Sequence, residues 1–214
     1  MLKGVLFDMD GVLVDSEAYI CQAAIQMFSE MGVVAIPSEF KPFVGMGENQ
    51  YIGGVAEMHG LILDIEQAKT RTYQLYSEIV HQKLQPLPGV YSFLEACQAR
   101  GLKLALATSA DKVKMETNLA EIGIGTDTFH ALVNGLDIAR KKPYPDIYLR
   151  ASALLGLDPE ECLVVEDAVS GVEAAKAAGC RCLAVTGSFK APELMGADWV
   201  CSSLEAVPLG VLNW

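Results

Sequence analysis

Two aspartates, Asp8 and Asp10, directly follow an apolar run that is suited to a buried strand. In parallel α/β sheets, ligand sites lie just beyond the carboxyl ends of the strands, so both carboxylates are expected to face a crevice. Side chains at i and i+2 of an extended segment project to the same side, where two negative charges repel unless a cation or a shared proton intervenes. A hard divalent metal ion bound between the carboxylates is the simplest way to offset this repulsion. The alternative that stays open is a strand end whose carboxylates are solvated and bind nothing. A calcium loop is excluded, because Val12 occupies a ligand position of the EF-hand spacing.

The composition describes a globular acidic protein. The chain has 214 residues, is 51% hydrophobic and carries a formal net charge of −11, with a pI near 4.7 and a mean hydropathy of +0.29. This is enough for a substantial core of one domain plus an insertion. The negative charge and the lack of Lys/Arg clusters disfavour nucleic acid or an anionic membrane as a partner. With no signal-peptide pattern and no uncharged run of spanning length, we expect a soluble, cytoplasmic monomer.

The six cysteines are scattered, mostly in apolar surroundings, with no C-x-x-C pair. This pattern is typical of buried free thiols in a reducing compartment. Cys180 and Cys182 are close together, but the lack of a second cysteine pair or nearby histidines disfavours a zinc site.

The segment after the first strand is helical, where a simple β-α-β unit would return to a second strand. Apolar spacing predicts helices over 18–31, 49–58 and 64–80. We therefore predict an all-helical cap domain, residues 16–83, inserted into an α/β core domain of residues 1–15 and 84–214. The chain crosses between the two parts twice, which permits hinge motion, and a rigid decoration is the alternative that stays open.

Strands and helices alternate regularly after the insertion. Short apolar runs predict strands over 102–107, 131–133, 162–165 and 182–185. Helical spacing predicts helices over 90–100, 112–122, 146–155 and 169–178. The alternation indicates a doubly wound parallel sheet of the Rossmann-like kind.

Several of these strands end in a polar group. The groups are Thr108 and Ser109 after the strand over 102–107, Lys142 in extended backbone before Pro143, and Glu166 and Asp167 after the strand over 162–165. Phosphoryl transfer requires such a set: a nucleophile, a cation, donors for the phosphoryl oxygens and a general acid/base. An aspartate can be the nucleophile by forming an acyl phosphate. Alone, Thr108 would be a helix N-cap and Lys142 a surface lysine, but their order along one sheet favours a shared site.

Four segments together resemble the haloacid dehalogenase superfamily, in its β-phosphoglucomutase-like branch with a small helical C1 cap. They are 8–17, 104–110, 142–148 and 164–171, and the resemblance covers essentially the whole chain. It implies a Mg²⁺-dependent enzyme with an aspartyl-phosphate intermediate, in which Asp8 is the nucleophile. It further implies that Asp10 is the general acid/base and lends its backbone carbonyl to Mg²⁺.

The same resemblance assigns the other motif residues. Thr108 would bind the transferring phosphoryl group, with the backbone of Ser109 close by, and Lys142 would steady the nucleophile and the phosphoryl charge. Asp167 first and Glu166 second would join Asp8 and Asp10 as Mg²⁺ ligands. We also expect substrate contacts from the cap loop, namely Gly45, Gly47, Glu48 and Asn49.

The cap departs from the mutase pattern of that branch. Tyr19 and Ile20 stand where a histidine is expected, and the loop over 43–51 contains no Lys or Arg. A mutase must hold a bisphosphorylated intermediate, which an uncharged or acidic loop does poorly. We therefore favour a phosphatase that acts on a small phosphorylated metabolite of the sugar-phosphate kind.

Two alternatives to the phosphatase stay open. A mutase would interconvert hexose 1-phosphate and 6-phosphate, with Lys41 or Lys69 supplying the missing cation. A non-catalytic phosphate-binding protein would retain the fold without the reaction. Glu48 either contacts the substrate or a second cation, or is a solvated loop residue. A nucleotide cofactor is not expected, because the stretch from Gly45 to Gly47 lacks the preceding strand and the third glycine of a dinucleotide fingerprint.

Overall fold

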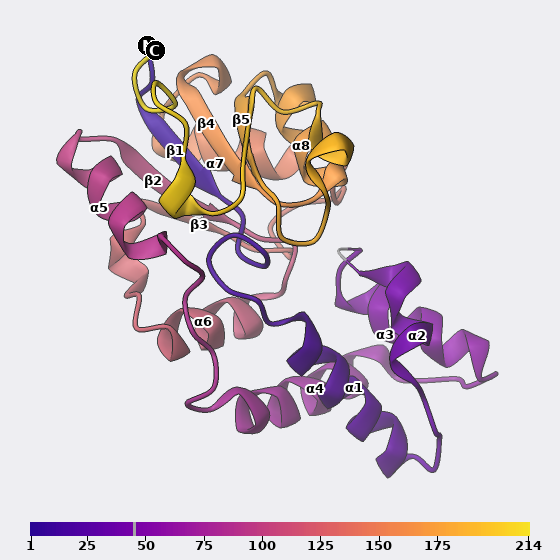
Figure 1. Cartoon of the computed structure of the whole chain (residues 1–214). Coiled ribbons are helices and arrows are strands. Elements are labelled where there is room, and N and C mark those ends of the chain that lie inside the picture. The colour runs from indigo at the N-terminus through magenta and orange to yellow at the C-terminus, as the bar shows by residue number, and fades with distance from the viewer. Residues whose placement is uncertain (45) are drawn as a thin grey trace.

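The computed structural model describes residues 1–44 and 46–214, and its strands form a six-stranded parallel sheet in the order β3-β2-β1-β4-β5-β6 (Figure 1). The strands are β1 (Gly4–Phe7), β2 (Lys103–Ala107), β3 (Ala131–Val133), β4 (Cys162–Glu166), β5 (Arg181–Val185) and β6 (Trp199–Cys201). The helices are α1 (Glu17–Glu30), α2 (Pro37–Phe40), α3 (Glu48–Met58), α4 (Ile65–Val80), α5 (Val90–Ala99), α6 (Lys112–Glu121), α7 (Asp146–Leu155) and α8 (Val169–Ala178).

Strand β1 is central, and its position defines the crevice of the fold. All four of its residues are buried, as expected for a parallel strand covered on both faces. It pairs with β2 on one side and with β4 on the other, so that Phe7 lies opposite both Leu106 and Val165. Strand order reverses between β1 and β4, and ligands of such sheets bind beyond the carboxyl ends of the strands at this switch point.

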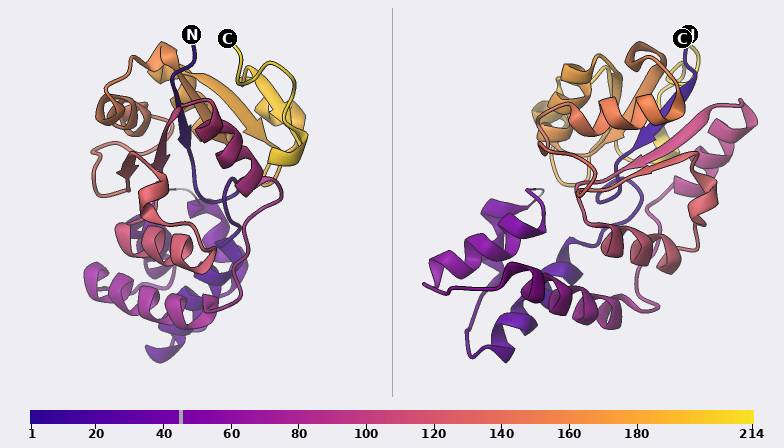
Figure 2. Two further views of the ribbon diagram at one scale, coloured as in Figure 1. Left: turned by 90° about the vertical axis from the view of Figure 1, so that its left-hand side faces the viewer. Right: turned by 180° about the vertical axis from the view of Figure 1, so that it is seen from behind.

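Helices cover both faces of the sheet (Figure 2). Alternate residues of the strands belong to different apolar clusters: Leu6 packs with residues of α7 and α8, whereas Val5 and Phe7 pack with residues of α5 and α6. This alternation follows from the two-residue period of a strand. The predicted doubly wound α/β fold is therefore confirmed.

The helices α1 to α4 lie beyond the carboxyl ends of the strands, and both termini lie at the opposite end of the sheet (Figure 1). Among themselves they pack through aromatic rings: the Phe40 centroid lies 6.1 Å from that of Phe28 and 5.0 Å from that of Tyr51. Helix α4 contacts both α1 and α6. The helical insertion is thus present, while the domain boundaries at residues 15/16 and 83/84 stay a prediction.

Two elements escaped the sequence patterns. Helix α2 has four residues, too few to show a helical period, and β6 has three, of which two are only partly buried. Every helix and strand that the sequence predicted is present, with ends that differ by at most a residue or two. In the part of the chain that the structure describes, no helix is long and apolar enough to cross a membrane.

The cysteines provide a first test of the fold. Burial raises the pKa of Cys97, Cys162 and Cys180 to about 12, and Cys182 and Cys201 are also buried, whereas Cys21 is partly exposed. Because the thiolate is the reactive form, we expect Ellman's reagent at neutral pH to titrate at most Cys21 rapidly in the native protein and all six thiols after unfolding. A Cys21→Ser variant should lose the rapid phase. Rapid reaction of several thiols in the native protein would contradict the described core.

Candidate active site

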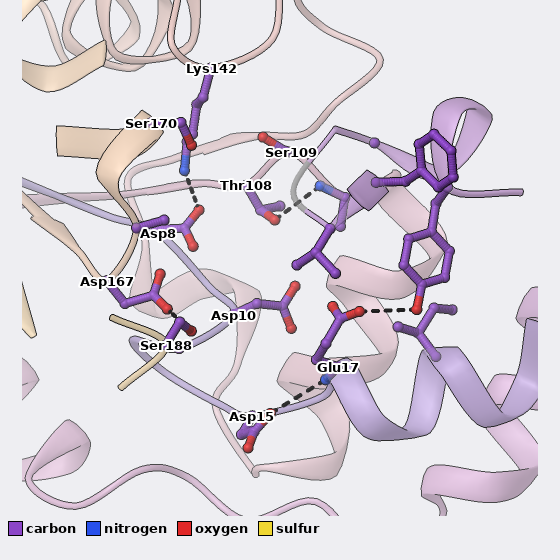
Figure 3. Close-up of a pocket in the computed structure, with 18 of the residues that line it drawn as sticks. Asp8, Asp10, Asp15, Glu17, Thr108, Ser109, Lys142, Asp167, Ser170 and Ser188 are labelled. Carbon is purple, nitrogen blue, oxygen red and sulfur yellow. Dashed lines mark hydrogen bonds and ion pairs between the residues drawn. The ribbon is translucent and has the colours of Figure 1, made fainter. Parts of the chain in front are cut away.

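Asp8 is the first residue after β1 and lies at the switch point of the sheet. Its backbone amide donates to the Val165 carbonyl of β4 (2.9 Å), which holds the residue in register with the neighbouring strand. The residue is 7% exposed, and Lys142 Nζ donates to its Oδ1 at 2.6 Å (Figure 3). Burial raises the pKa of the Asp8 carboxyl well above its usual range, although the Lys142 ammonium opposes this shift.

Lys142 is held between Asp8 and Glu166, the last residue of β4. Glu166 is completely buried, and both of its oxygens are occupied. Its Oε1 accepts from Lys142 and from the Tyr148 hydroxyl (2.6 Å), and its Oε2 accepts from the backbone amides of the next two residues (2.9 and 3.1 Å). A buried carboxylate needs such compensation. Glu166 therefore fixes the Lys142 ammonium against Asp8.

Asp167 completes a buried acidic group. One oxygen each from Asp8, Glu166 and Asp167 lie within 4.8 Å of one another. Asp167 accepts from the Ser188 hydroxyl, and burial, followed by the charge of Glu166, raises its pKa to about 7. One ammonium faces these three carboxylates, so the group as a whole is short of positive charge.

This acidic group fits a magnesium ion. Mg²⁺ prefers hard oxygen ligands and is held by one or two carboxylates together with substrate phosphate. Asp8 and Asp167 each keep one oxygen without a hydrogen bond from the described residues, whereas both oxygens of Glu166 are engaged. Asp8 and Asp167 are thus the side chains best disposed to hold the ion, with Glu166 behind them.

Two glycines permit the close approach of these groups. A methyl group at Gly171 would lie 1.9 Å from the Glu166 carboxylate, and one at Gly11 would lie 1.9 Å from Asp167 Oδ2. Gly11 also has a φ of +76°, which side chains disfavour. A residue with a side chain at either position would therefore displace the neighbouring carboxylate.

Asp10 lies two residues beyond Asp8, at the start of the turn that follows β1. Strand β1 ends at Phe7, and Asp8 and Asp10 both line the cavity beyond it. Lys114 Nζ donates to Asp10 Oδ2 at 2.7 Å, and the Ser16 hydroxyl donates to Oδ1. Figure 3 shows the Asp10 carboxylate close to Glu17, on the same side of the backbone as the Asp8 carboxylate. The buried acidic group does not include the Asp10 side chain, and a metal contact through its backbone carbonyl stays a prediction.

Thr108 and Ser109 follow β2 and border the same crevice. Thr108 is 2% exposed, and its Oγ1 accepts from the Ala110 amide at 3.1 Å, which leaves the hydroxyl hydrogen free to donate elsewhere. The buried Ser109 Oγ has no hydrogen-bond partner among the described residues. The Thr108 hydroxyl is therefore available as a donor near Asp8 (Figure 3).

A cavity of about 290 Å³ connects these core residues with the helical insertion. On the insertion side it is lined by Glu17, Ile20, Lys41, Phe43, Val44, Gly47, Glu48 and Tyr51. The Tyr51 hydroxyl donates to Glu17 Oε1 at 3.0 Å. Glu48 is the first residue of α3 and is 7% exposed, and its Oε2 has no hydrogen-bond partner among the described residues. Burial raises the pKa of Glu48.

Only some of the predicted cap-loop residues line the cavity. Gly47 and Glu48 line the cavity, but Asn49 is exposed and is not among the lining residues, and Gly45 lies outside the described residues. Lys69 is buried and bridges Asp111 (3.0 Å) and Glu66 (3.2 Å) away from the cavity. Of the two cap lysines considered for a second phosphate, Lys41 lines the cavity.

Four residues of the site were not found from the sequence: Ser16, Lys114, Tyr148 and Ser188. Each contacts a motif residue through its side chain. Lys114 lies 104 residues from Asp10 in the chain, and only the packing of α6 beside the switch point brings them together. Ser16 and Tyr148 could have been found from the sequence, because they fall inside the motif segments 8–17 and 142–148.

Comparison with known proteins agrees with this geometry. The family model of the haloacid dehalogenase-like hydrolases matches residues 5–185, and the chain therefore belongs to this family. Hexitol phosphatase A of Escherichia coli is 31% identical over 96% of this chain and 93% of its own length. β-Phosphoglucomutase of Bacillus subtilis is 29% identical over 99% of this chain and 94% of its own length.

A higher identity is found with a much longer protein. The chloroplastic protein SUPPRESSOR OF QUENCHING 1 of Arabidopsis thaliana is 41% identical over 86% of this chain, which corresponds to 18% of that protein. Among solved structures, CbbY of Rhodobacter sphaeroides in complex with phosphate superposes with a TM-score of 0.90 at 25% identity, with complete coverage of both chains. The whole fold, including the helical insertion, is thus shared with this relative.

The close approach at Gly11 can be tested by substitution. Gly11→Ala should lose most Mg²⁺-dependent activity, because the methyl group displaces the Asp167 carboxylate. Gly32→Ala is the matched control: Gly32 has a φ of +78° and no neighbour within 4 Å, so both variants carry a backbone cost of about 1–2 kcal/mol. Thermal unfolding and the Mg²⁺ concentration for half-maximal activity would be measured for both. Equal losses of activity in the two variants would show that backbone strain alone is responsible.

Proposed function

We propose that this protein is a Mg²⁺-dependent phosphatase that hydrolyses the phosphate monoester of a small, sugar-like metabolite through an aspartyl phosphate on Asp8. The observation that carries the proposal is the placement of the Asp8 carboxylate, pinned by Lys142 at the floor of a metabolite-sized cavity. Named phosphatases among the relatives support it. We expect the protein to act as a cytoplasmic monomer without nucleic acid or membrane.

In the first step, the free oxygen of Asp8 attacks phosphorus while the bond from phosphorus to the leaving oxygen breaks. Asp10 begins this step with a proton on one carboxyl oxygen and gives it to the leaving oxygen, so the product leaves as a neutral alcohol and Asp10 becomes a carboxylate. Lys142, Thr108 and Ser109 neutralise or donate to the phosphoryl oxygens. When bound, Mg²⁺ reduces the repulsion between the phosphoryl group and the attacking carboxylate.

In the second step, water attacks the phosphorus of the aspartyl phosphate and the bond to Asp8 breaks. The Asp10 carboxylate takes a proton from this water, which returns both aspartates to their starting states and releases inorganic phosphate. The same residue thus serves as acid and then as base.

The mutase is the second candidate, because a β-phosphoglucomutase is among the relatives. A mutase must also hold the phosphate at the far end of its bisphosphate. Glu17 and Glu48 line the insertion side of the cavity, and Lys41 is the cation there among the described residues. Two carboxylates against one lysine disfavour a second phosphate on Coulombic grounds. A non-catalytic phosphate-binding role is disfavoured because the nucleophile, the lysine and the acidic group are all in place.

The nucleophile assignment predicts the outcome of a single substitution. Asp8→Asn should lower Mg²⁺-dependent release of phosphate from 4-nitrophenyl phosphate on the order of 10³-fold or more, because the attacking carboxylate is gone. Circular dichroism should show an intact fold, and Asp127→Asn, at an exposed position outside the cavity, should keep wild-type turnover. Unchanged turnover of Asp8→Asn would refute the assignment.

The choice between phosphatase and mutase predicts a product ratio. With β-glucose 1-phosphate and a catalytic amount of the 1,6-bisphosphate, the protein should release inorganic phosphate and form little glucose 6-phosphate, because the insertion side of the cavity repels a second phosphate. Phosphate and glucose 6-phosphate would be measured in parallel. Formation of glucose 6-phosphate in excess of phosphate would establish the mutase instead.

A further inference from the structure

Lys114 is a buried cation that neither the motifs nor the steps above employ. It lies in the first turn of α6, is 4% exposed and lines the cavity. Its Nζ donates to Asp10 Oδ2 at 2.7 Å. A fully desolvated lysine is uncommon unless it is paired, so the Asp10 carboxylate is the reason why this side chain is held inside.

Helix α6 holds Asp10 from two sides. Asn118 lies one helical turn after Lys114 and donates from Nδ2 to the Ser16 hydroxyl at 3.4 Å, and that hydroxyl donates to Asp10 Oδ1. Asn118 also accepts from the hydroxyl of Tyr76 in α4. Residues four apart share a helix face, so a single face of α6 determines the direction of both Asp10 oxygens.

That direction matters for the reaction. In phosphoryl transfer, the attacking and leaving oxygens are roughly in line with phosphorus, so the leaving oxygen lies on the side opposite Asp8. The Asp10 carboxylate lies close to Glu17 (Figure 3), and Glu17 lines the side of the cavity formed by the insertion. The Lys114 contact thus holds the proton donor where the leaving group departs.

We propose that Lys114 is a positioning residue for general acid catalysis: its ammonium keeps the Asp10 carboxyl group beside the leaving oxygen and stabilises the carboxylate that forms as the proton is transferred. The inference rests on the proposed phosphatase function. Lys114 keeps its protons throughout. The transferred proton moves from Asp10 to the leaving oxygen in the first step, and water returns a proton to Asp10 in the second. Charge-assisted hydrogen bonds of this length are the strong ones.

A purely structural ion pair is the competing explanation. Removal of one partner from a buried pair destabilises a protein by several kcal/mol, so a simple loss of activity would not separate the two. The dependence on the leaving group does separate them, because a poor leaving group needs a proton and a good one does not. A structural defect lowers the rates for both kinds of substrate by the same factor.

The experiment uses single-turnover release of phenols from aryl phosphates of matched shape, with Mg²⁺ and enzyme in excess. The series runs from 4-nitrophenyl phosphate, a good leaving group, to phenyl phosphate, whose phenol has a pKa of about 10. Lys114→Met should slow release from phenyl phosphate about tenfold to a hundredfold more than release from 4-nitrophenyl phosphate. Lys114→Arg should restore part of the difference, and Asp10→Asn should show an equal or larger one.

The matched control is Lys112→Met on the same helix. Lys112 is exposed and pairs with Glu116 at 3.6 Å outside the cavity, so its loss should change neither rate. Equal slowing of both substrates in Lys114→Met, or slowing of neither, would overturn the inference.

If Lys114→Met fails to fold, the ratio of the rates with phenyl phosphate and 4-nitrophenyl phosphate is measured for Lys114→Arg and Lys114→Gln instead. A wild-type protein that releases no phosphate would overturn the proposed function. If the wild-type protein is active but Asp10→Asn shows no dependence on the leaving group, only the acid role of Asp10 and the role of Lys114 are overturned.

Discussion

The site depends on one buried interaction, the Lys142 ammonium held between Asp8 and Glu166. Desolvation of three ionised groups is costly, and the attraction between them does not by itself recover that cost. The compensation comes from the end of β4, where the Tyr148 hydroxyl and two backbone amides saturate Glu166. With Asp167 beside them the cluster keeps an excess of negative charge. Such an arrangement favours a bound cation more than it stabilises the fold.

The two sides of the cavity have different origins. The core supplies Asp8 from the end of β1 and Glu166 and Asp167 from the end of β4, two strands that adjoin each other in the sheet; Lys142 comes from the segment between β3 and α7. The insertion forms the other side of the cavity, with Glu17 and Glu48 as its carboxylates. Asp10 stands at the boundary, since its chain position belongs to the core motif while its carboxylate faces the insertion. Asp10 is therefore the residue that connects the core side of the cavity with the insertion side.

The insertion is tied to the core by more than its two chain crossings. Lys69 of α4 pairs with Asp111 at the start of α6, and Tyr76 of α4 donates to Asn118 further along α6. Both contacts are buried, and a buried pair is expensive to separate. A hinge motion of the insertion, if it accompanies substrate binding, would pivot about this α4–α6 contact more easily than it would break it. The hinge itself stays a hypothesis.

The amino-acid sequence by itself determined the strands, most of the helices and the order in which polar residues follow the strands, because these are local patterns of period and spacing. It placed Asp8, Thr108, Lys142, Glu166 and Asp167 at one edge of the sheet, and the structure brings them to a common cavity. The tertiary structure alone decided which partner several side chains have: Asp10 pairs with Lys114, Lys69 pairs with Asp111, and Glu166 accepts from Lys142. These pairs join residues that lie tens to more than a hundred positions apart, as do Lys142 and Asp8, 134 residues apart, and no local pattern records the direction of such a contact.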